Sequence, residues 1–590
     1  MPVYPPVRRG FALPLGLCLA ACGSGPIPSE GQRAVISLEG AFPQRPWMGP
    51  PMAVPELSLQ TVVRLPAGRR AEAADLVLDG MWFHAKVEVD GAELPVVSGG
   101  APTVRVPLGD AFADGEASLV IRVRPPAPGF NPRVTGGGLS TFRQTVQLDR
   151  PWLARPPRIE LHPAAHVRTS VLVANPDGTV TPTAWTDGAP AGSTVHFSAR
   201  LDGEQIAALG TAVVGSDGVA TGAPVAWNGP RWTPSSPGLV FFEATLVDGS
   251  GAQLDHRADR TGVRRLTVQA AALSIEDEPY RLHAVRHNFF PTPRSLFDEA
   301  GGVLSMGINA LEFHGEFAPD DWYAQADELG IPVVRLARCA GLASQHAETA
   351  AGYEDVLVDQ DRRTVEGLHH HPSAVLWVGE PGPVMGVNGP SSLDTPRLAQ
   401  DPHRRPRVDG DVHGVPIDPN QPRPCGDYPC RGGFAREVLA ANPQTWGRAA
   451  QVWQEQVAAG MWGGVLPTAE AVNGTLDTWG QIFGPMLKAL AVQPWPQVQR
   501  RAPSAVAVTG LPPNEVVFLE VQGLAAAGVV SSPSGAAELS AWHQGDATLR
   551  VGAQSMPITL RAGIYDGAAR RTAPVSVSWV PSLSNTPELQ

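Results

Sequence analysis

The sequence has no long run of basic residues, and its 57 acidic residues outnumber its 45 lysines and arginines, for a net charge of −12. Proteins that bind nucleic acid chiefly neutralise phosphates with clustered basic side chains. We therefore expect no nucleic-acid partner. Charged residues are scarce at 17%, whereas apolar residues make up 43%. This balance indicates a globular chain rather than a disordered one.

The amino terminus lacks an apolar run long enough to span a bilayer. Arg8 and Arg9 are followed by a short apolar stretch, Phe11–Ala20, which is typical of a secretory signal rather than a membrane helix. Leu19-Ala20-Ala21-Cys22 resembles a bacterial lipobox, with Cys22 as the lipidated residue. The alternative is an ordinary signal peptide with a chance cysteine. We predict a signal peptide over 1–21 and a tether over 22–32, and Gly23 fits outer-membrane sorting. The predicted location is the bacterial cell envelope, with a lipid anchor in the membrane.

Cysteine is rare, with five residues in the chain. Cys18 would leave with the signal, and Cys22 would carry the lipid. Cys425 and Cys430 are close enough in sequence to bridge a tight loop, and an oxidising envelope permits a disulfide. Cys339 is left over and is interpreted as a buried apolar thiol rather than a nucleophile. No His/Cys cluster has metal-ligand spacing, so no metal site is predicted.

The length of 590 residues predicts roughly four domains, and the 63 glycines and 60 prolines suit short strands and turns. Residues 33–156 alternate as strands with Asp-Gly turns, and residues 157–272 form a second sandwich pattern. Residues 273–500 alternate strands with helices, which favours a parallel barrel. That span is shorter than the roughly 250 residues of a typical barrel, so some helices or loops must be reduced. Residues 501–590 read as a closing β-sandwich.

One stretch, His369–Glu380, dominates the functional interpretation. Its apolar segment Ala374–Trp377 predicts a buried strand, and a carboxylate follows it after a glycine. This stretch resembles the H-P-S-(apolar)-W-x-G strand of glycoside hydrolase family 2, the β-galactosidase, β-glucuronidase and β-mannosidase group. The matching residues are His371-Pro372-Ser373, Trp377 and Gly379. The adjacent histidines could bind a metal, but the resemblance accounts better for His371-Pro372.

Further signatures occur in the family's order. They are Trp232-Thr-Pro-Ser-Ser-Pro237 followed by Gly262-Val-Arg264, Tyr280–His287 as a first barrel strand, Gly307–His314 as a second, and Asp401–Pro406 leading to a fifth strand over Arg407–His413. The resemblance covers about residues 33–495. It implies a jelly-roll sugar-binding-like domain over 33–156, an immunoglobulin-like sandwich over 157–272 and a reduced (β/α)8 TIM barrel over 273–500, before the final β-sandwich.

The resemblance also implies a retaining mechanism with two carboxyl groups about 5 Å apart. Glu380 is the candidate acid/base after strand four, and Glu437 in Phe434–Val438 is the candidate nucleophile on strand seven. Two alternatives stay open. An alignment without gaps places Gly382 on the family's catalytic Glu, which leaves no acid/base, and Glu437 could instead be a solvent-facing residue of a helix over Arg436–Ala441.

Polar and aromatic residues at the expected barrel rim are the candidate substrate contacts: His314, Glu316, Trp377, Asp411, His413 and Trp462. We predict a carbohydrate partner and no cofactor. The sequence supports two functions. One is an envelope-anchored glycoside hydrolase that cleaves O-glycosyl bonds of β-linked glycans, and the other is a catalytically degenerate lipoprotein that binds glycan or serves as a scaffold.

Overall fold

The structure is a computed structural model, and it describes the chain in segments. Residues 1–32, with Cys22, and residues 418–433, with Cys425 and Cys430, lie outside the described residues, so the lipid anchor and the disulfide stay predictions. The described segments are 33–42, 56–65, 71–81, 84–98, 103–124, 151, 153–269, 272–287, 308–313, 318–336, 359, 362–378, 401–408, 414–417, 434–438, 450–451, 453–454, 463–466, 500–502, 504–521, 524–541, 543–552, 554–566, 569–570 and 573–579.

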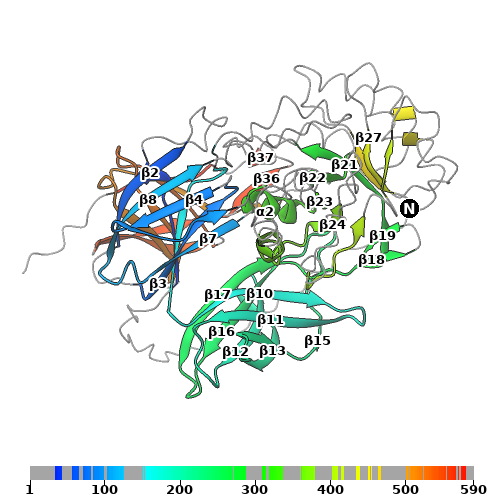
Figure 1. Cartoon of the computed structure of the whole chain (residues 1–590), viewed down its shortest axis with the longest axis horizontal. Helices are drawn as coiled ribbons and strands as arrows, with labels where there is room; N and C mark the ends of the chain where they lie inside the picture. Colours follow the sequence, from blue (N-terminus) through cyan, green and yellow to red (C-terminus); the bar gives the residue numbers. More distant parts are fainter. Residues whose placement is uncertain are drawn as a thin grey trace, which may run out of the picture.

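Strands dominate the described residues, and they form several layers (Figure 1). Among the described residues, helical structure comprises η1 (Glu39–Ala41), α2 (Asp320–Leu329), residue 359, the segment 362–367, and residues 450–451 and 453–454. Across the described ranges, no helix combines the length and the apolar character that a membrane crossing requires.

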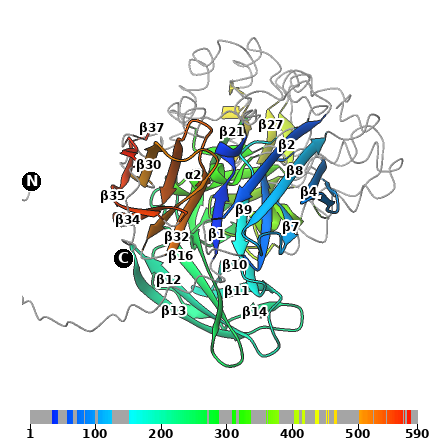
Figure 2. The ribbon, with the colours of Figure 1, turned by 90° about the vertical axis from the view of Figure 1, so that its left-hand side faces the viewer.

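The first sandwich shares one sheet with the carboxyl-terminal domain. The sheet order is β35-β34-β31-β32-β1-β9-β3-β7, and the pair β1–β32 is parallel. Figure 2 shows the early strands in blue beside the late strands in orange. The strands are β1 (Ala34–Ser37), β3 (Ala73–Asp79), β7 (Thr103–Gly109), β9 (Arg158–His162), β31 (Val516–Val521), β32 (Leu524–Val530), β34 (Gly545–Val551) and β35 (Gln554–Leu560). The predicted boundary at 156 therefore falls before the last strand of this sandwich, because β9 pairs with both β1 and β3.

A second sheet closes the first sandwich, in the order β2-β8-β4-β5 with β6 beside β4. β8 alternates buried and half-buried residues along its length, as expected for a strand with one face in a core. Both sheets contribute to one apolar cluster that includes Leu76 and Ile121 and extends to Phe518 of β31. The strands are β2 (Leu57–Arg64), β4 (His84–Val89), β5 (Ala92–Glu93), β6 (Val97–Ser98) and β8 (Glu116–Arg124).

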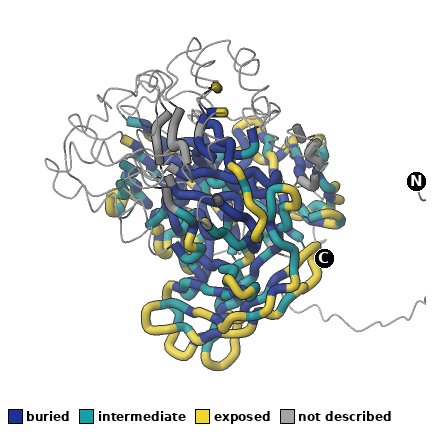
Figure 3. The backbone as a smooth tube through the Cα atoms, turned by 90° about the vertical axis from the view of Figure 1, so that its right-hand side faces the viewer, coloured by how far each residue is buried: buried dark blue, intermediate teal, exposed yellow. Residues whose placement is uncertain are grey.

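The second sandwich lies at the bottom of Figure 1 and packs two antiparallel sheets around the cluster of Phe197, Trp227 and Phe242. One sheet has β10 (His166–Ala174), β11 (Thr179–Asp187), β14 (Val219–Thr221) and β15 (Val225–Ala226). The other has β12 (Thr194–Leu201), β13 (Glu204–Val213), β16 (Val240–Val247) and β17 (Gln253–Thr261). Figure 3 shows its outer hairpins exposed, whereas the middle of the molecule is buried.

A small sheet leads from the second sandwich to the next domain and crosses the boundary predicted at 272. It consists of β18 (Leu266–Gln269), β19 (Ala272–Ile275) and β20 (Glu278–Tyr280). Two further small sheets belong to the end of the chain. They are formed by β29 (Arg500–Ala502), β36 (Gly563–Asp566) and β37 (Ala569–Arg570), and by β30 (Ser504–Thr509), β33 (Ala537–Ala541) and β38 (Val575–Ser578).

The predicted barrel region contains an eight-stranded sheet in which every described pair is parallel. The order is β25-β24-β23-β22-β21-β28-β27-β26, so the first and last strands along the chain are neighbours. The strands are β21 (Leu282–His287), β22 (Ala310–Phe313), β23 (Val333–Leu336), β24 (Ala374–Val378), β25 (Arg407–Val408), β26 (Gly414–Ile417), β27 (Phe434–Val438) and β28 (Gly463–Leu466).

Local sequence explains the best-defined β–α–β unit of this sheet. Asp320 and Asp321 occupy the first turn of α2, where acidic side chains interact favourably with the helix dipole. Gly330 ends the helix with φ of 70°, a left-handed conformation that favours glycine. β23 follows directly, as predicted. Between β25 and β26 the chain has only residues 409–413, too few for a helical crossover between parallel strands.

The shared sheet gives a stability prediction. Gly40 of η1 packs so tightly against β32 that a Cβ atom would lie 1.9 Å from the Val530 carbonyl oxygen. We expect Gly40→Ala to lower the free energy of unfolding by about 1–3 kcal/mol, because overpacking forces the backbone apart. Urea denaturation would measure the change. As a control, Gly249→Ala should change stability by less than about 0.5 kcal/mol, because its Cβ would meet nothing nearer than 3.9 Å. Equal stability of both variants would show that η1 and β32 are not packed as described.

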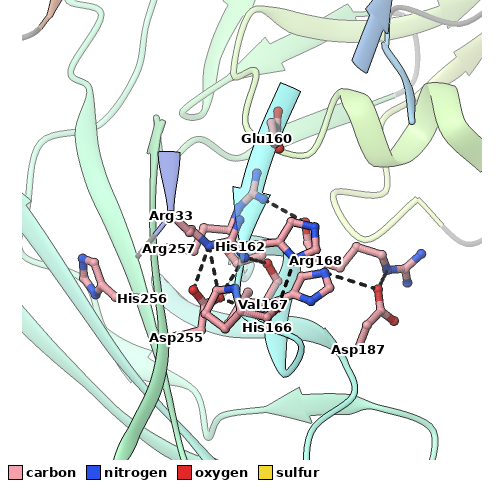
Figure 4. A network of polar contacts seen from close by, with 12 residues as sticks. Arg33, Glu160, His162, His166, Val167, Arg168, Asp187, Asp255, His256 and Arg257 are labelled. Atoms are coloured by element: carbon pink, nitrogen blue, oxygen red, sulfur yellow. Dashed lines mark hydrogen bonds and ion pairs between the residues drawn. The ribbon is translucent and has the colours of Figure 1, made fainter. Parts of the chain in front are cut away.

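A polar junction joins the first sandwich to the second (Figure 4). Arg33, just before β1, binds the Asp255 carboxylate of β17 through Nε at 2.9 Å and Nη2 at 2.8 Å. The same carboxylate accepts the Val167 backbone N–H at 2.8 Å. Arg257 donates to the Arg168 carbonyl at 2.8 Å and pairs with Asp259. Because the Asp255 side chain is only 1% exposed, the Arg33 contact is largely interior and ties the start of β1 to β17 of the second sandwich.

Candidate active site

The amino-terminal end of the parallel sheet is covered by the second sandwich. Trp232 and Leu239 pack in one cluster with Leu282, Ala310 and Val375, which lie at or near the starts of their strands. Chemistry in parallel α/β sheets occurs at the opposite, carboxyl-terminal ends of the strands. The covered, amino-terminal end of the sheet therefore has a structural role, and the candidate active site belongs to the carboxyl-terminal ends of the strands.

His371 of the His-Pro-Ser motif lies at the structural end, immediately before β24. Its Nδ1 is 2.7 Å from Oδ2 of Asp327 and its Nε2 is 3.0 Å from Oδ1 of Asp320, both on α2. Burial alone would lower the pKa of His371, but the charge and hydrogen bonds of the two carboxylates raise it to about 10. The side chain is therefore a buried imidazolium. It ties β24 to α2 and takes no part in chemistry at the other edge.

The two strongest sequence signatures meet at this place. Asp327 also accepts the Ser373 backbone N–H at 2.8 Å, and its carbonyl accepts Nε1–H of Trp232 at 2.8 Å. Arg264 donates to the Ala374 carbonyl at 2.5 Å. A Cβ on Gly262 would lie 2.8 Å from Pro372. The residues of the Trp232 and Gly262–Arg264 signatures thus pack around the start of β24.

The segment Asp401–Pro406, which leads into the neighbouring strand β25, also contacts β24. Asp401 Oδ2 accepts Nε1–H of Trp377 at 3.0 Å, and its Oδ1 accepts Nη1–H of Arg405 at 2.7 Å. Although burial alone would raise the pKa of Asp401, the charge of Arg405 holds that pKa below its usual range. Arg405 also donates to the Ala374 carbonyl at 2.8 Å. Trp377 is 1% exposed, so it packs here as a buried side chain, and its predicted contact with substrate stays a prediction.

The two candidate carboxylates belong to strands four and seven of the sheet, counted from β21. Glu380 comes two residues after Val378, the last residue of β24, and lies outside the described residues. Glu437 is the penultimate residue of β27. The alternative of a helix beginning at Arg436 is therefore wrong for residues 436–438. A register shift inserts one extra residue in β27, so that Glu437 is in register with Pro416.

The other predicted contacts fall beside the described strands. His314 follows directly on Phe313, the last residue of β22, and Glu316 comes two residues later. Of the predicted fifth strand, the structure describes Arg407–Val408 as β25, and residues 409–413 lie outside the described residues; His413 directly precedes Gly414, the first residue of β26. Trp462 directly precedes Gly463, the first residue of β28. It therefore adjoins the amino-terminal end of that strand and not the carboxyl end expected from the sequence. His314, Glu316, Asp411, His413 and Trp462 themselves lie outside the described residues.

Comparisons with known proteins define the fold. No family model matches the sequence. An FMN-binding β-glucuronidase from Facaelibacterium prausnitzii L2-6 superposes with a TM-score of 0.57 at 15% identity, covering 90% of this chain and 98% of that chain. A β-glucuronidase of Bacteroides uniformis gives 0.56 at 12% identity, covering 93% and 80%. A family 2 β-galacturonidase from Eisenbergiella tayi, bound to galacturonate, gives 0.55 at 14% identity, covering 74% and 90%. The chain has a glycoside hydrolase family 2-like fold.

A sequence relative supports the same fold over a shorter span. The β-galactosidase of Lactococcus lactis subsp. lactis (strain IL1403) is 26% identical over 162 residues, which is 25% of this chain and 16% of that protein. The match thus spans less than a fifth of this relative's length. The family 2 resemblance of the sequence does not predict the roles of Asp320, Asp327 and Asp401. The Asp-Pro-x-Arg-x-Pro pattern at 401–406 was the available signal for Asp401, whereas the two aspartates of α2 read as ordinary helix residues.

Proposed function

We propose that this chain is a retaining glycoside hydrolase acting on β-linked glycans, with Glu437 as nucleophile and Glu380 as acid/base. The observation that carries the proposal is the position of the two carboxylates: one near the carboxyl end of strand seven and one just after strand four of an eight-stranded parallel sheet. A retaining mechanism needs two carboxyl groups about 5 Å apart across the scissile bond. If a sheet with this strand order closes as a barrel, the carboxyl ends of strands four and seven lie at the same mouth of the barrel.

The finer architecture is part of the proposal. The adjacency of β21 and β28 is the neighbour relation of a (β/α)8 barrel, and we assign the sheet to a reduced TIM barrel. The first sandwich is assigned as the jelly-roll domain and the second as the immunoglobulin-like domain. The extra residue in β27 supports the role of Glu437, because such irregularities in parallel strands redirect side chains and often adjoin active sites.

The second candidate function is a glycan-binding protein that has lost hydrolysis. It is favoured by the position of Glu380, which comes two residues earlier than the acid/base of the family motif. Two residues along a strand preserve the face of a side chain but retract it by about 6–7 Å. Catalytic groups tolerate a misplacement of about 1 Å poorly. A working Glu380 therefore requires the chain after Val378 to bring its carboxylate forward.

The proposed substrate class is a β-linked glycan, because the similar proteins include β-glucuronidases, a β-galacturonidase and a β-galactosidase. The proposed contacts are His314, Glu316, Trp377, Asp411 and His413. We further propose a lipid anchor at Cys22 and an envelope location, for which the lipobox resemblance is the support.

The deciding experiment is hydrolysis of aryl β-glucuronide, β-galacturonide, β-galactoside and β-mannoside by the protein without residues 1–21. Turnover that Glu380→Gln and Glu437→Gln each abolish would support the assigned pair. Absence of turnover on every sugar, with binding of at least one glycan by calorimetry, would instead establish the glycan-binding function. Turnover that survives both substitutions would show that the carboxylates are assigned wrongly.

A further inference from the structure

Trp377 is the last residue before the break in the family motif whose side chain the structure describes. Its indole is held by several neighbouring groups. Only Val378 and Gly379 separate it from Glu380. Its ring is buried, its Nε1 donates to Asp401 at 3.0 Å, and the Arg405 guanidinium lies 5.9 Å from its ring centroid. Its backbone N–H donates to the Pro406 carbonyl at 2.9 Å. Every one of these partners comes from the segment that leads into β25.

Asp401 uses both carboxylate oxygens in this arrangement. Oδ1 accepts Arg405 Nη1–H at 2.7 Å and the His403 backbone N–H at 3.1 Å. Oδ2 accepts the indole N–H at 3.0 Å and the Arg405 backbone N–H at 3.3 Å. The side chains of Asp401 and Arg405 are each 1% exposed. A carboxylate with four donors in a buried site has little freedom to move, so the indole that it binds is fixed as well.

We propose that Asp401 is a positioning residue that holds the carboxyl end of β24, and through it Glu380, by fixing the indole of Trp377. This inference rests on the proposed function, because it requires Glu380 to be the acid/base. The physical reason is the short separation in sequence: Glu380 follows Trp377 by three positions, so a displaced Trp377 is expected to displace the chain that carries the proposed acid/base. A misplacement of about 1 Å in a catalytic group costs on the order of a hundredfold in rate.

The test uses the mature protein with Asp401→Asn and, separately, Trp377→Phe, on glycosides of one sugar with different aryl groups. Phenol is a poor leaving group and needs a proton from the acid, whereas 2,4-dinitrophenol leaves as an anion without one. We expect each variant to lower kcat on the phenyl glycoside by about tenfold or more, within the range that general acids supply. On the 2,4-dinitrophenyl glycoside the glycosylation step should be slowed by less than about threefold.

A matched control is Trp232→Phe, since Trp232 is also buried and also donates its indole N–H, at 2.8 Å, but at the structural end of the sheet. Trp232→Phe should lower stability and leave the ratio of the two rates unchanged. Equal slowing of both substrates by Asp401→Asn, or an altered ratio in Trp232→Phe, would overturn the positioning role. Asp401→Asn keeps the size of the side chain, so it serves if Trp377→Phe does not fold.

Backbone hydrogen exchange of the peptide that covers residues 376–382 separates this inference from the proposed function. Asp401→Asn and Trp377→Phe should each accelerate exchange there by about tenfold or more, and Trp232→Phe should not. Unchanged exchange in this peptide would overturn the inference whether or not the protein hydrolyses glycosides. An inactive protein with accelerated exchange would refute the hydrolase function but retain Asp401 as the residue that fixes the end of β24.

Discussion

Replacing Glu437 by Ala is expected to lower kcat for aryl β-glycosides by on the order of 10⁴-fold or more, because no covalent intermediate can form without the nucleophile. Glu437 lies on β27, the seventh strand of the parallel sheet. Steady-state kinetics on the best sugar of the panel would measure the loss. Replacing Glu380 by Ala should cost about 10²–10⁴-fold, the usual contribution of a general acid.

Azide distinguishes the two roles. In Glu437→Ala, azide would occupy the place of the nucleophile, displace the aryl alcohol directly and give the α-glycosyl azide after one inversion. In Glu380→Ala with a good leaving group, the glycosyl-enzyme would still form and azide would release the β-glycosyl azide after two inversions. Glu538→Gln, an exposed carboxylate of β33, is the control and should keep full activity. Full activity of Glu437→Ala would exclude it as the nucleophile.

Asp327→Asn is expected to lower the free energy of unfolding by about 3–5 kcal/mol, because it removes one partner from a buried ion pair. The His371 imidazolium would keep only Asp320, whose side chain is 43% exposed, whereas that of Asp327 is 6% exposed. Urea denaturation at pH 6 would measure the loss. Asp187→Asn is a control, since that carboxylate is half exposed beside His166, and its effect should stay below about 0.5 kcal/mol.

The ion pairing of His371 also makes the stability of the fold depend on pH. The pKa of His371 is about 10 in the folded chain, against roughly 6.5 in an unfolded chain. A raised pKa stabilises the fold fully below pH 6.5 and progressively less as the pH rises toward 10. The mature protein should therefore lose stability between pH 6.5 and 10, and His371→Gln should be less stable at pH 6 but show a flatter dependence. An equal alkaline decline in both proteins would show that His371 is not charged in the fold.

The motifs that resemble family 2 predicted the positions of strands better than the roles of individual side chains. His371-Pro372-Ser373 correctly marked the start of a strand, but its histidine is an ion-paired support at the structural end. Trp377 was predicted as a substrate contact, and its burial is explained by Asp401, 24 residues away in the chain. Neither fact can be derived from spacing, because ion pairs and buried hydrogen bonds depend on which distant carboxylate packs nearby.

The sequence by itself determined the local elements: α2 with acidic residues at its start and Gly330 at its end, the apolar strand β24, and the alternating strands of the sandwiches. These follow from helix dipoles, backbone conformation and side-chain periodicity, which act over a few residues. Only the tertiary structure decided that β1 pairs with β32 from the other end of the chain, and that Glu437 lies in a strand. The segment Ala-Arg-Glu-Val-Leu-Ala at 435–440 suits a helix by composition, but pairing of its first part with β26 and β28 overrides that local preference.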